Sequence, residues 1–313
     1  MGLRLLSILL LLCLSKSEAQ PDSLITDYIQ TFPEKITTRA SLVNTSNSFL
    51  ITDKASNTTI KLEPNTRQYL GFSILFRSLE IDFGFAPTFI RENKDNENSK
   101  LFNLNMRMFL GQWMQTLDLY SQRGFTAQSS GETNDLPEFK TFTIGGSTSY
   151  VFNDKFSFRA VGFQNEWQKK SAGSFIPRLF YYYTSFNPLP NEDNIHSIDV
   201  AVTPSYYYNF VIQNHFLIGV GAGLGVGLNI NTFEEESLTS ALFEYVGRLS
   251  VGYNSEHFFA GMNSNITAFD HNANRTTKIE DSIKFVEFYI GYRFDAPKSM
   301  LRLADKINAA IGL

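Results

Sequence analysis

Strict alternation of two residue types marks the segment Phe216–Ile230. Every even position is apolar, whereas five successive odd positions, from Gly219 to Gly227, are glycine. Successive side chains of a strand point to opposite sides, so the pattern predicts a strand with one apolar face. The other face is nearly bare, which predicts that something bulky lies across it. A phosphate-binding glycine loop is excluded, because no G-x-G-x-x-G spacing occurs and no helical pattern follows.

The same period-two pattern repeats along most of the chain. Many segments run to the length of about 9–11 residues that a tilted strand needs to cross a bilayer. Each has one apolar face and one face that mixes charged with small residues, which is the pattern of outer-membrane barrels. The sequence therefore predicts an all-β fold, a transmembrane antiparallel β-barrel of about 12–14 strands. The main predicted strands are Gln68–Phe76, Ser78–Ala86, Leu101–Leu110, Trp113–Gly124, Phe139–Phe152, Phe156–Phe163, Ser174–Ser185, Ile195–Ile212, Phe216–Ile230, Ser240–Tyr253, Phe258–Phe269 and Ile283–Phe294, preceded by the shorter Lys35–Val43, Ser48–Lys54 and Thr59–Leu62.

The connectors alternate in length, with short turns and long polar loops, as expected for the two ends of a membrane barrel. The predicted long loops are Arg91–Lys100, Thr126–Glu138 and Asp270–Asp281. One count conflicts with this scheme. The turns at Asn153–Lys155 and Gln213–His215 are both short and belong at the same end, yet three predicted strands lie between them. Either one of these strands is misassigned or the Gln213–His215 turn faces the other end.

The N-terminus has the pattern of a secretory signal peptide, with Arg4 before an apolar core and the small residues Ser17 and Ala19 at a cleavage site. We therefore predict four parts: a signal peptide over residues 1–19, a periplasmic lead-in over 20–34, the outer-membrane barrel over 35–295 and a tail over 296–313.

The tail changes period after Pro297. Its apolar residues recur at helical spacing, which predicts a short amphipathic C-terminal helix; they are Met300, Leu303, Ile307 and Ile311. We expect this helix to pack in the periplasm, with a position on the membrane surface or inside the lumen as alternatives.

Composition excludes several classes of protein. Removal of residues 1–19 also removes Cys13, so the mature chain has no cysteine, which argues against a small disulfide scaffold. It leaves 25 basic and 30 acidic side chains, a net charge of −5, and no basic run that would hold nucleic acid. Aromatic residues make up 14% of the chain although its mean hydropathy is only −0.15, which suits strands with alternating faces.

One segment resembles a known family. Phe156–Phe175 has the sequence FSFRAVGFQNEWQKKSAGSF, and together with the aromatic run Phe180–Tyr183 it resembles a family of uncharacterised Bacteroidetes barrels, domain of unknown function 4421. Leu62–Asn65, Tyr69–Phe76 and Phe288–Phe294 are similar as well, and the likeness spans Ile25 to Pro297. The resemblance implies an outer-membrane barrel and brings no activity with it.

Charged residues in the predicted strands must point inward, because an arginine on the lipid face costs about 2–4 kcal/mol at the bilayer midplane. We expect them to form ion pairs across the lumen, and the residues concerned are notably Arg107, Asp118, Arg159, Glu244, Arg248, Glu287 and Arg293. The densest polar segment, Glu166–Ser171, either binds lipopolysaccharide phosphates or a solute, or simply closes the barrel mouth with Trp167 in the interfacial aromatic belt. The candidate lumen or rim cluster comprises Arg159, Glu166, Trp167, Lys169, Lys170, Arg248, Glu287 and Arg293.

Enzymatic motifs are missing from the sequence. No H-E-x-x-H or G-x-S-x-G occurs, so we predict no catalytic residue, no cofactor and no metal, and we interpret the four histidines as surface residues. The tyrosine runs Tyr181–Tyr183 and Tyr206–Tyr208 either stack on carbohydrate or, as we favour, form part of an aromatic girdle.

These features favour a non-enzymatic bacterial outer-membrane protein, either a narrow passive channel or a structural barrel. The expected partners are outer-membrane lipid and lipopolysaccharide, and the barrel-assembly machinery during insertion. Two alternatives stay open. An outer-membrane lipid-modifying enzyme would need a serine and a histidine on the same rim, and a soluble periplasmic lipid-binding barrel would pack its apolar files inward.

Overall fold

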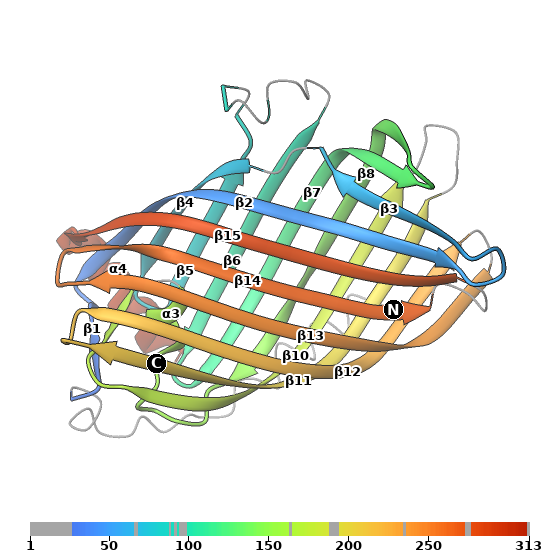
Figure 1. Cartoon of the computed structure of the whole chain (residues 1–313). Coiled ribbons are helices and arrows are strands. Elements are labelled where there is room, and N and C mark those ends of the chain that lie inside the picture. The colour runs from blue at the N-terminus through green and yellow to red at the C-terminus, as the bar shows by residue number, and fades with distance from the viewer. Residues whose placement is uncertain are drawn as a thin grey trace.

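Twelve antiparallel strands close into one barrel in the part of the chain that the structure describes (Figure 1). The computed structural model describes residues 27–65, 68–87, 89–90, 93, 99–162, 165–187, 194–233, 236–272 and 277–311. Closure comes from β15 (Thr277–Asp295), which pairs with β2 (Lys35–Asp53) along its whole length. The predicted transmembrane barrel is thus confirmed. The other strands of the ring are β4 (Gln68–Phe76), β5 (Leu79–Phe85), β6 (Lys100–Leu110), β7 (Trp113–Ser129), β8 (Glu132–Tyr150), β10 (Ala172–Asn187), β11 (Ile195–Ile212), β12 (Phe216–Phe233), β13 (Glu236–Asn254) and β14 (Phe258–Asn272).

Three shorter strands lie outside this ring. β3 (Thr58–Pro64) pairs with the far ends of β2 and β7, so it continues the wall beyond the shorter strands β4 and β6. β1 (Ile29–Thr31) and β9 (Glu166–Gln168) form a separate antiparallel pair. We call the end where β2 begins and β15 ends the termini end, and the opposite end the loop end.

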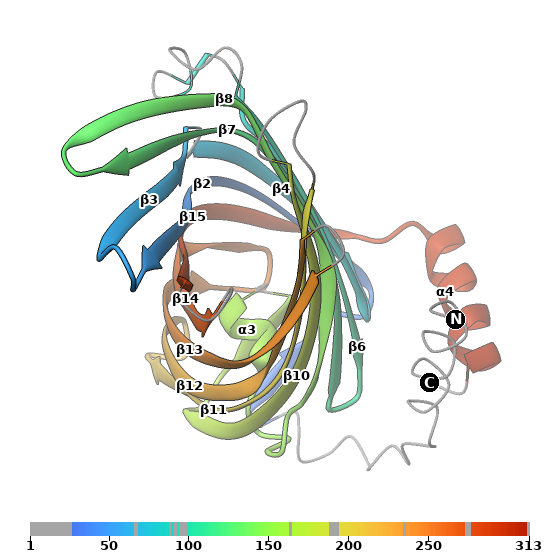
Figure 2. The ribbon, with the colours of Figure 1, turned by 90° about the vertical axis from the view of Figure 1, so that its right-hand side faces the viewer.

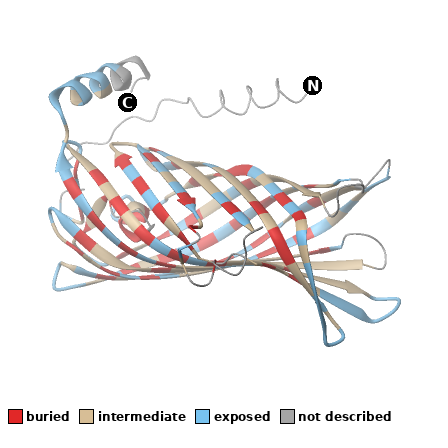
Figure 3. Cartoon of the chain, turned by 90° about the horizontal axis from the view of Figure 1, so that it is seen from above, coloured by how far each residue is buried: buried red, intermediate tan, exposed pale blue. Residues whose placement is uncertain are grey.

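Buried and exposed positions alternate along the strands (Figure 3). In β12 the apolar residues face outward and are exposed, whereas the glycines face inward. A Cβ on Gly221 would overlap the ring of Tyr207, and one on Gly219 would lie 3.0 Å from Val161 Cγ1. The prediction that something bulky lies across the glycine face is therefore confirmed, and the exposed apolar positions are Phe216, Val220, Leu224, Val226 and Leu228.

The connection between β8 and β10 folds into the barrel at the termini end. Its helix α3 (Phe158–Gly162) lies inside the ring when the barrel is viewed along its axis (Figure 2). The predicted strand Phe156–Phe163 is therefore wrong. Alternation of Phe156 and Phe158 with polar residues imitates a strand, but Phe158 and Val161 are spaced for one side of a helical turn, and both are buried.

Removal of that strand resolves the conflict in the strand count. Of the strands of the ring, only β10 and β11 lie between the turns at Asn153–Lys155 and Gln213–His215. Two strands return the chain to the same end, so both turns lie at the termini end, as their shortness indicates.

Two predicted loops are largely strand. β7 and β8 continue as a long hairpin through the predicted loop Thr126–Glu138, with a turn at Ser130 and Gly131. Both turn residues have positive φ, 50° and 88°, as the two-residue turns that match strand twist require. β14 and β15 likewise extend into the predicted loop Asp270–Asp281. These extensions lack an apolar face. Hydrogen bonds between the paired backbones of the two strands are enough to keep the chain extended there.

The predicted C-terminal helix is present as α4 (Lys298–Ile311), and it lies outside the barrel wall (Figures 2 and 3). Arg77 at a termini-end turn pairs with its Asp305 at 2.7 Å. The alternative that the tail helix lies inside the lumen is therefore wrong, and the helix inside the ring is α3. Among the described residues, no helix has the length and apolar character needed to cross a bilayer.

The predicted signal peptide, residues 1–19, lies outside the described residues. Of the predicted lead-in 20–34, the described part contains β1, which is hydrogen-bonded to β9 of the folded-in connection. This stretch is therefore part of the folded structure at the termini end.

Candidate functional site

The folded-in connection fills the termini end of the lumen; we call its described residues, 153–162 and 165–170, the plug. Phe156, Phe158 and Val161 form one buried apolar cluster with side chains from the barrel wall. A helix as short as α3 is unstable alone, so packing against the wall must hold it in place. The wall residues of this cluster include Leu75, Phe109, Met114, Ile176 and Tyr207.

Buried hydrogen bonds also fix the plug. The Oε1 atom of Gln168 accepts from the Ser157 backbone N at 2.7 Å and from Asn209 Nδ2 at 3.2 Å. Arg159 pairs with Glu166 at 3.1 Å and donates to the backbone carbonyl of Arg77 in the barrel wall. Because a buried polar group that loses its partner costs about 1–3 kcal/mol, these bonds resist displacement of the plug.

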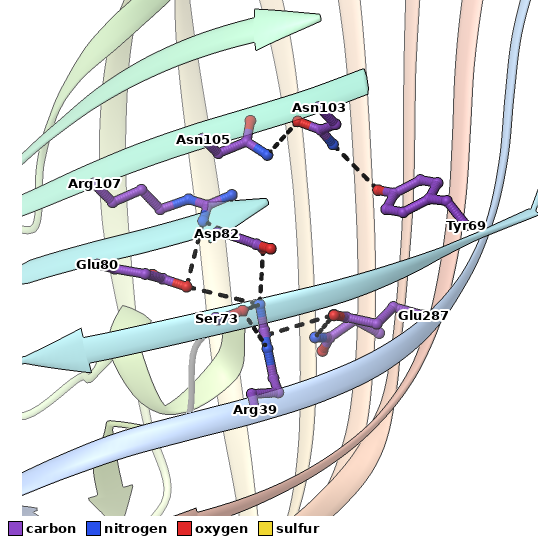
Figure 4. A network of polar contacts seen from close by, with 10 residues as sticks. Arg39, Tyr69, Ser73, Glu80, Asp82, Asn103, Asn105, Arg107 and Glu287 are labelled. Carbon is purple, nitrogen blue, oxygen red and sulfur yellow. Dashed lines mark hydrogen bonds and ion pairs between the residues drawn. The ribbon is translucent and has the colours of Figure 1, made fainter. Parts of the chain in front are cut away.

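A network of charges crosses the inner wall next to the plug (Figure 4). Arg39 Nη2 lies 3.1 Å from Asp82 and 3.7 Å from Glu80, and Arg39 Nη1 lies 3.6 Å from Glu287. Arg107 reaches Glu80 at 3.4 Å. We call these five residues the charged layer. Their three carboxylates and two guanidinium groups sit on β2, β5, β6 and β15, so the layer ties together strands from both ends of the chain.

A second set of polar contacts joins β7, β10, β11 and β13. Arg178 pairs with Glu244, whose side chain is fully buried and also accepts from the hydroxyl of Thr203. Tyr182 donates its hydroxyl to Asp118 at 2.6 Å. Every one of these groups points into the barrel, where neighbouring charges can compensate the cost of burial.

Arg248 joins the polar wall to the plug. Its guanidinium carbon lies 5.2 Å from the ring centroid of Phe158 in α3. This is the distance of a cation–π contact. The ring of Phe158 is therefore the contact between the plug and the Arg248 guanidinium of the lumen wall.

Above the charged layer the lumen holds a cavity of about 1170 Å³. This volume exceeds the range of about 300–1,000 Å³ that is usual for ligand sites. Its arginines lie toward the termini end, and its apolar lining lies toward the loop end. The lumen is thus a cup with a polar floor and a largely apolar upper wall, formed by Val43, Phe49, Ile51, Leu62, Phe139, Phe180, Phe186, Ile195, Leu238, Phe269, Ile279, Ile283 and Phe285.

Aromatic rings pack across part of the loop end. Phe49 of β2 meets Phe186 of β10 edge to face, with ring centroids 5.4 Å apart, and Phe125 meets Phe139 at 4.9 Å. Leu62 of β3 belongs to the same buried cluster. These contacts brace the wall at the point where β3 replaces β4 and β6.

The predicted site residues fall into separate places. Arg159 and Glu166 come together within the plug, as described. Trp167 lies at the rim, where its Nε1 donates to the Asn214 carbonyl at 2.6 Å and Lys169 Nζ sits 5.0 Å from its ring. Lys170 reaches out to Asp27 at 3.2 Å.

The remaining three predicted residues face the interior. Arg248 and Glu287 both line the cavity. Arg293 is buried lower down, 4.1 Å from the ring centroid of Phe32 and 4.8 Å from that of Phe259. The eight residues therefore do not form one cluster.

Sequence reasoning missed three members of the charged layer, Arg39, Glu80 and Asp82. A signal for two of them was present, because Glu80 and Asp82 alternate with the apolar file of the predicted strand Ser78–Ala86. Arg39 lies between Thr37 and Ser41 on the inner face of β2, and nothing local distinguishes it from a solvated arginine.

The prediction of surface histidines is wrong for His271, which is only 5% exposed and lines the cavity. His196 contacts the hydroxyl of Tyr183 at 2.8 Å, and His215 contacts the Asn254 carbonyl. Within the described ranges, no histidine ring is hydrogen-bonded to a serine or a carboxylate. Nor does that part of the chain hold a group of three potential metal ligands.

The closed ring, its outward apolar files and its polar interior define a transmembrane β-barrel that is plugged at one end. The chain belongs to the family described as Domain of unknown function (DUF4421), whose model matches residues 20–294. The resemblance found in the sequence is thereby confirmed. No curated protein matches the chain.

Several solved outer-membrane barrels are similar to the chain at low sequence identity. The outer membrane protease OmpT from Escherichia coli is 10% identical, with 84% of this chain and 97% of that one covered and a TM-score of 0.34. An outer membrane channel from Pseudomonas putida F1 is 10% identical, with 88% and 100% covered and a TM-score of 0.40. The translocator domain of the autotransporter NalP from Neisseria meningitidis is 10% identical, with 82% and 88% covered and a TM-score of 0.39. Such distant likenesses say nothing of activity.

Proposed function

We propose that the protein is a non-enzymatic outer-membrane barrel whose plug closes the lumen to free diffusion, leaving a cup that opens at the loop end. The observation behind this proposal is the plug itself, which is packed and hydrogen-bonded inside the ring beneath the charged layer. Of the two roles that the sequence favours, a passive channel and a structural barrel, the plug supports the second, with the cup as its functional surface.

The outward side chains support residence in a membrane. Apolar residues are exposed all around the barrel, and a soluble barrel would leave them in water. A belt of outward aromatic residues also lies near the termini end, where lipid headgroups would meet the wall. It includes Trp113, Tyr150, Phe152, Phe175, Tyr206, Tyr208, Phe216, Tyr253, Tyr292 and Phe294, several of them in ring-to-ring contact.

The outward apolar residues and the contacts of the histidines weigh against the two alternatives. A soluble periplasmic lipid-binding barrel would have its apolar files inside, and here they face outward. A lipid-modifying enzyme would need a base beside a nucleophile, and the described histidines have no serine partner. The proposed setting is the bacterial outer membrane, with its lipids and lipopolysaccharide around the barrel and the termini end in the periplasm.

Single-channel conductance of the refolded protein in a planar bilayer tests the proposal. The wild type should give no discrete steps. A variant with Phe158→Ala and Val161→Asp, which loosens the plug, should conduct while it keeps the heat-modifiable electrophoretic mobility of a folded barrel. Salt-dependent steps from the wild type would contradict a closed lumen.

A gated channel is the second candidate, because a smaller cavity of about 370 Å³ lies beside the plug at the termini end. Thr37 lines this cavity, and Arg39, the next inward residue of β2, lines the large one. Movement of the plug would join the two cavities into a path.

A disulfide can separate the two candidates. The mature chain that we predict has no cysteine, and a side chain at position 219 would lie against Val161. A double variant with Gly219→Cys and Val161→Cys should therefore lock the plug when oxidised. Wild-type conductance that is lost in the oxidised variant and restored by a reductant would favour the gated channel, whereas silence in both states supports the closed cup.

A further inference from the structure

Two carboxylates on the upper wall of the cavity have no basic partner among the described residues. Asp199 of β11 and Asp281 of β15 both line the cavity. Asp199 accepts a hydrogen bond from Asn229 Nδ2 at 2.6 Å, and Asp281 Oδ1 has no hydrogen-bond partner within the described residues. The arginines of the cavity lie lower, and three of them are engaged in ion pairs with Glu80, Asp82, Glu244 and Glu287.

An aromatic ring lies beside each of these two carboxylates. Asp281 is opposite Phe269 in the pairing of β15 with β14, and Asp199 is opposite Tyr182 in the pairing of β11 with β10. Phe269 meets Phe180 edge to face, with centroids 5.6 Å apart. Phe180 itself is only 1% exposed and already has the Arg178 guanidinium carbon 5.4 Å from its ring centroid, so Tyr182 and Phe269 are the rings open to a ligand. All three rings line the cavity. Carboxylates and ring faces together are the groups that attract an organic ammonium ion.

His271 adds a buried polar group to the same wall. It lies one inward position beyond Phe269 on β14, is 5% exposed, and its Nδ1 has no hydrogen-bond partner among the described residues. A buried polar atom without a partner is costly, so a ligand group that reaches it gains a hydrogen bond.

Other ligand classes fit less well. An anion would meet four arginines, three of them already in ion pairs, next to a larger number of carboxylates. A divalent metal would need several ligands together, and the described residues hold no group of three potential metal ligands. The apolar upper wall would remain unused by any small inorganic ion.

We propose that the cup binds an organic cation, an amine with an aromatic or aliphatic body. The ammonium group lies between Asp199 and Asp281 beside the rings of Tyr182 and Phe269, and the apolar body lies against the upper wall. This inference rests on the proposed function in one respect, namely that the cup is reached from the loop end.

Fluorescence anisotropy of two dyes tests the inference, with the full mature protein in nonionic maltoside micelles. Rhodamine 6G is a cation with an aromatic body, and fluorescein is a comparable anion. Rhodamine 6G should bind saturably and more weakly at high salt, and fluorescein should not bind. The double variant Asp199→Asn and Asp281→Asn should weaken rhodamine 6G binding at least about tenfold, or about 1.4 kcal/mol.

The matched control is Asp270→Asn with Glu280→Gln, which removes the same charge from the outward faces of β14 and β15. It should leave rhodamine 6G binding unchanged. If the lumen variant fails to show heat-modifiable mobility, competition on the wild type replaces it: benzyltrimethylammonium should displace the dye and benzyl alcohol should not. Equal binding of both dyes, an unaffected lumen variant or equal displacement would overturn the inference.

Conductance of the same preparation keeps the two proposals apart. A conducting wild type that binds rhodamine 6G through Asp199 and Asp281 overturns the closed lumen and leaves the cation site standing. A silent wild type that does not discriminate between the dyes overturns the cation site alone.

Discussion

The depth at which a charge is introduced on the lipid face of β12 should decide its cost. Phe216 lies in the aromatic belt, with its ring 5.4 Å from that of Tyr253. Strands rise about 3.3 Å per residue and tilt by about 40° in a barrel, so four residues climb about 10 Å along the axis. The apolar band of outer-membrane barrels is about 25 Å tall. Val220 therefore lies close to the bilayer midplane, and Leu228, at about 30 Å, lies beyond the band.

The expected cost follows from these depths. Arginine costs about 2–4 kcal/mol at the midplane and about 0–1 kcal/mol near an interface. Val220→Arg should therefore lower the free energy of unfolding by about 2–4 kcal/mol, and Leu228→Arg by about 0–1 kcal/mol. Val220→Ala serves as the control for lost packing, since it removes apolar surface without adding a charge.

Guanidinium unfolding in phosphocholine vesicles, followed by the fluorescence of Trp113 and Trp167, measures these free energies. The reasoning fails if the two arginine variants lose equal stability or if Leu228→Arg loses more. Either result would mean that the aromatic belt at Phe216 does not mark a membrane interface. A soluble barrel would show only small effects at both positions, because both side chains would already be in water.

Two further variants test the interior, and a third tests the turn between β7 and β8. Gly221→Val would force a side chain into the ring of Tyr207 and should cost about 1–3 kcal/mol of stability. The loss should appear as a lower yield of refolded protein on a gel, and an unchanged yield would mean that the inner face is not crowded. Arg178→Met should lower the free energy of unfolding in urea by about 3–5 kcal/mol, because it leaves the buried Glu244 without its ion-pair partner. Adding Glu244→Gln should recover part of that loss, and no recovery would show that the two residues are not coupled. Gly131→Ala should cost about 1–2 kcal/mol because φ is +88° there, although open space surrounds the position, and an unaltered melting temperature would contradict that conformation.

Sequence alternation predicted the strands well because it reflects backbone geometry that is the same in every strand. The predicted bounds Gln68–Phe76 and Ile195–Ile212 coincide with β4 and β11. The same alternation separated lipid-facing from lumen-facing positions in β12. It failed at Phe156–Phe163, because a segment this short satisfies a strand pattern and a single helical turn equally well, and packing against the wall chose the helix.

The polar interior was open to prediction only in part. That Arg248 and Glu287 face the lumen follows from the cost of charge in lipid. That Glu287 pairs with Arg39 does not, because the two residues stand at opposite ends of the chain and meet only when β15 closes onto β2. The burial of His271 in the cavity likewise depends on which face of β14 turns inward at its far end.

The sequence by itself thus determined the class of fold, the direction of each strand face and the need for closure, since these follow from local side-chain alternation and from the demand of the bilayer that backbone groups be paired. The tertiary structure alone decided that the lumen is plugged and which charges meet. Strand register and tilt set these contacts, and both arise from the closure of the whole ring, which no short segment of the chain encodes.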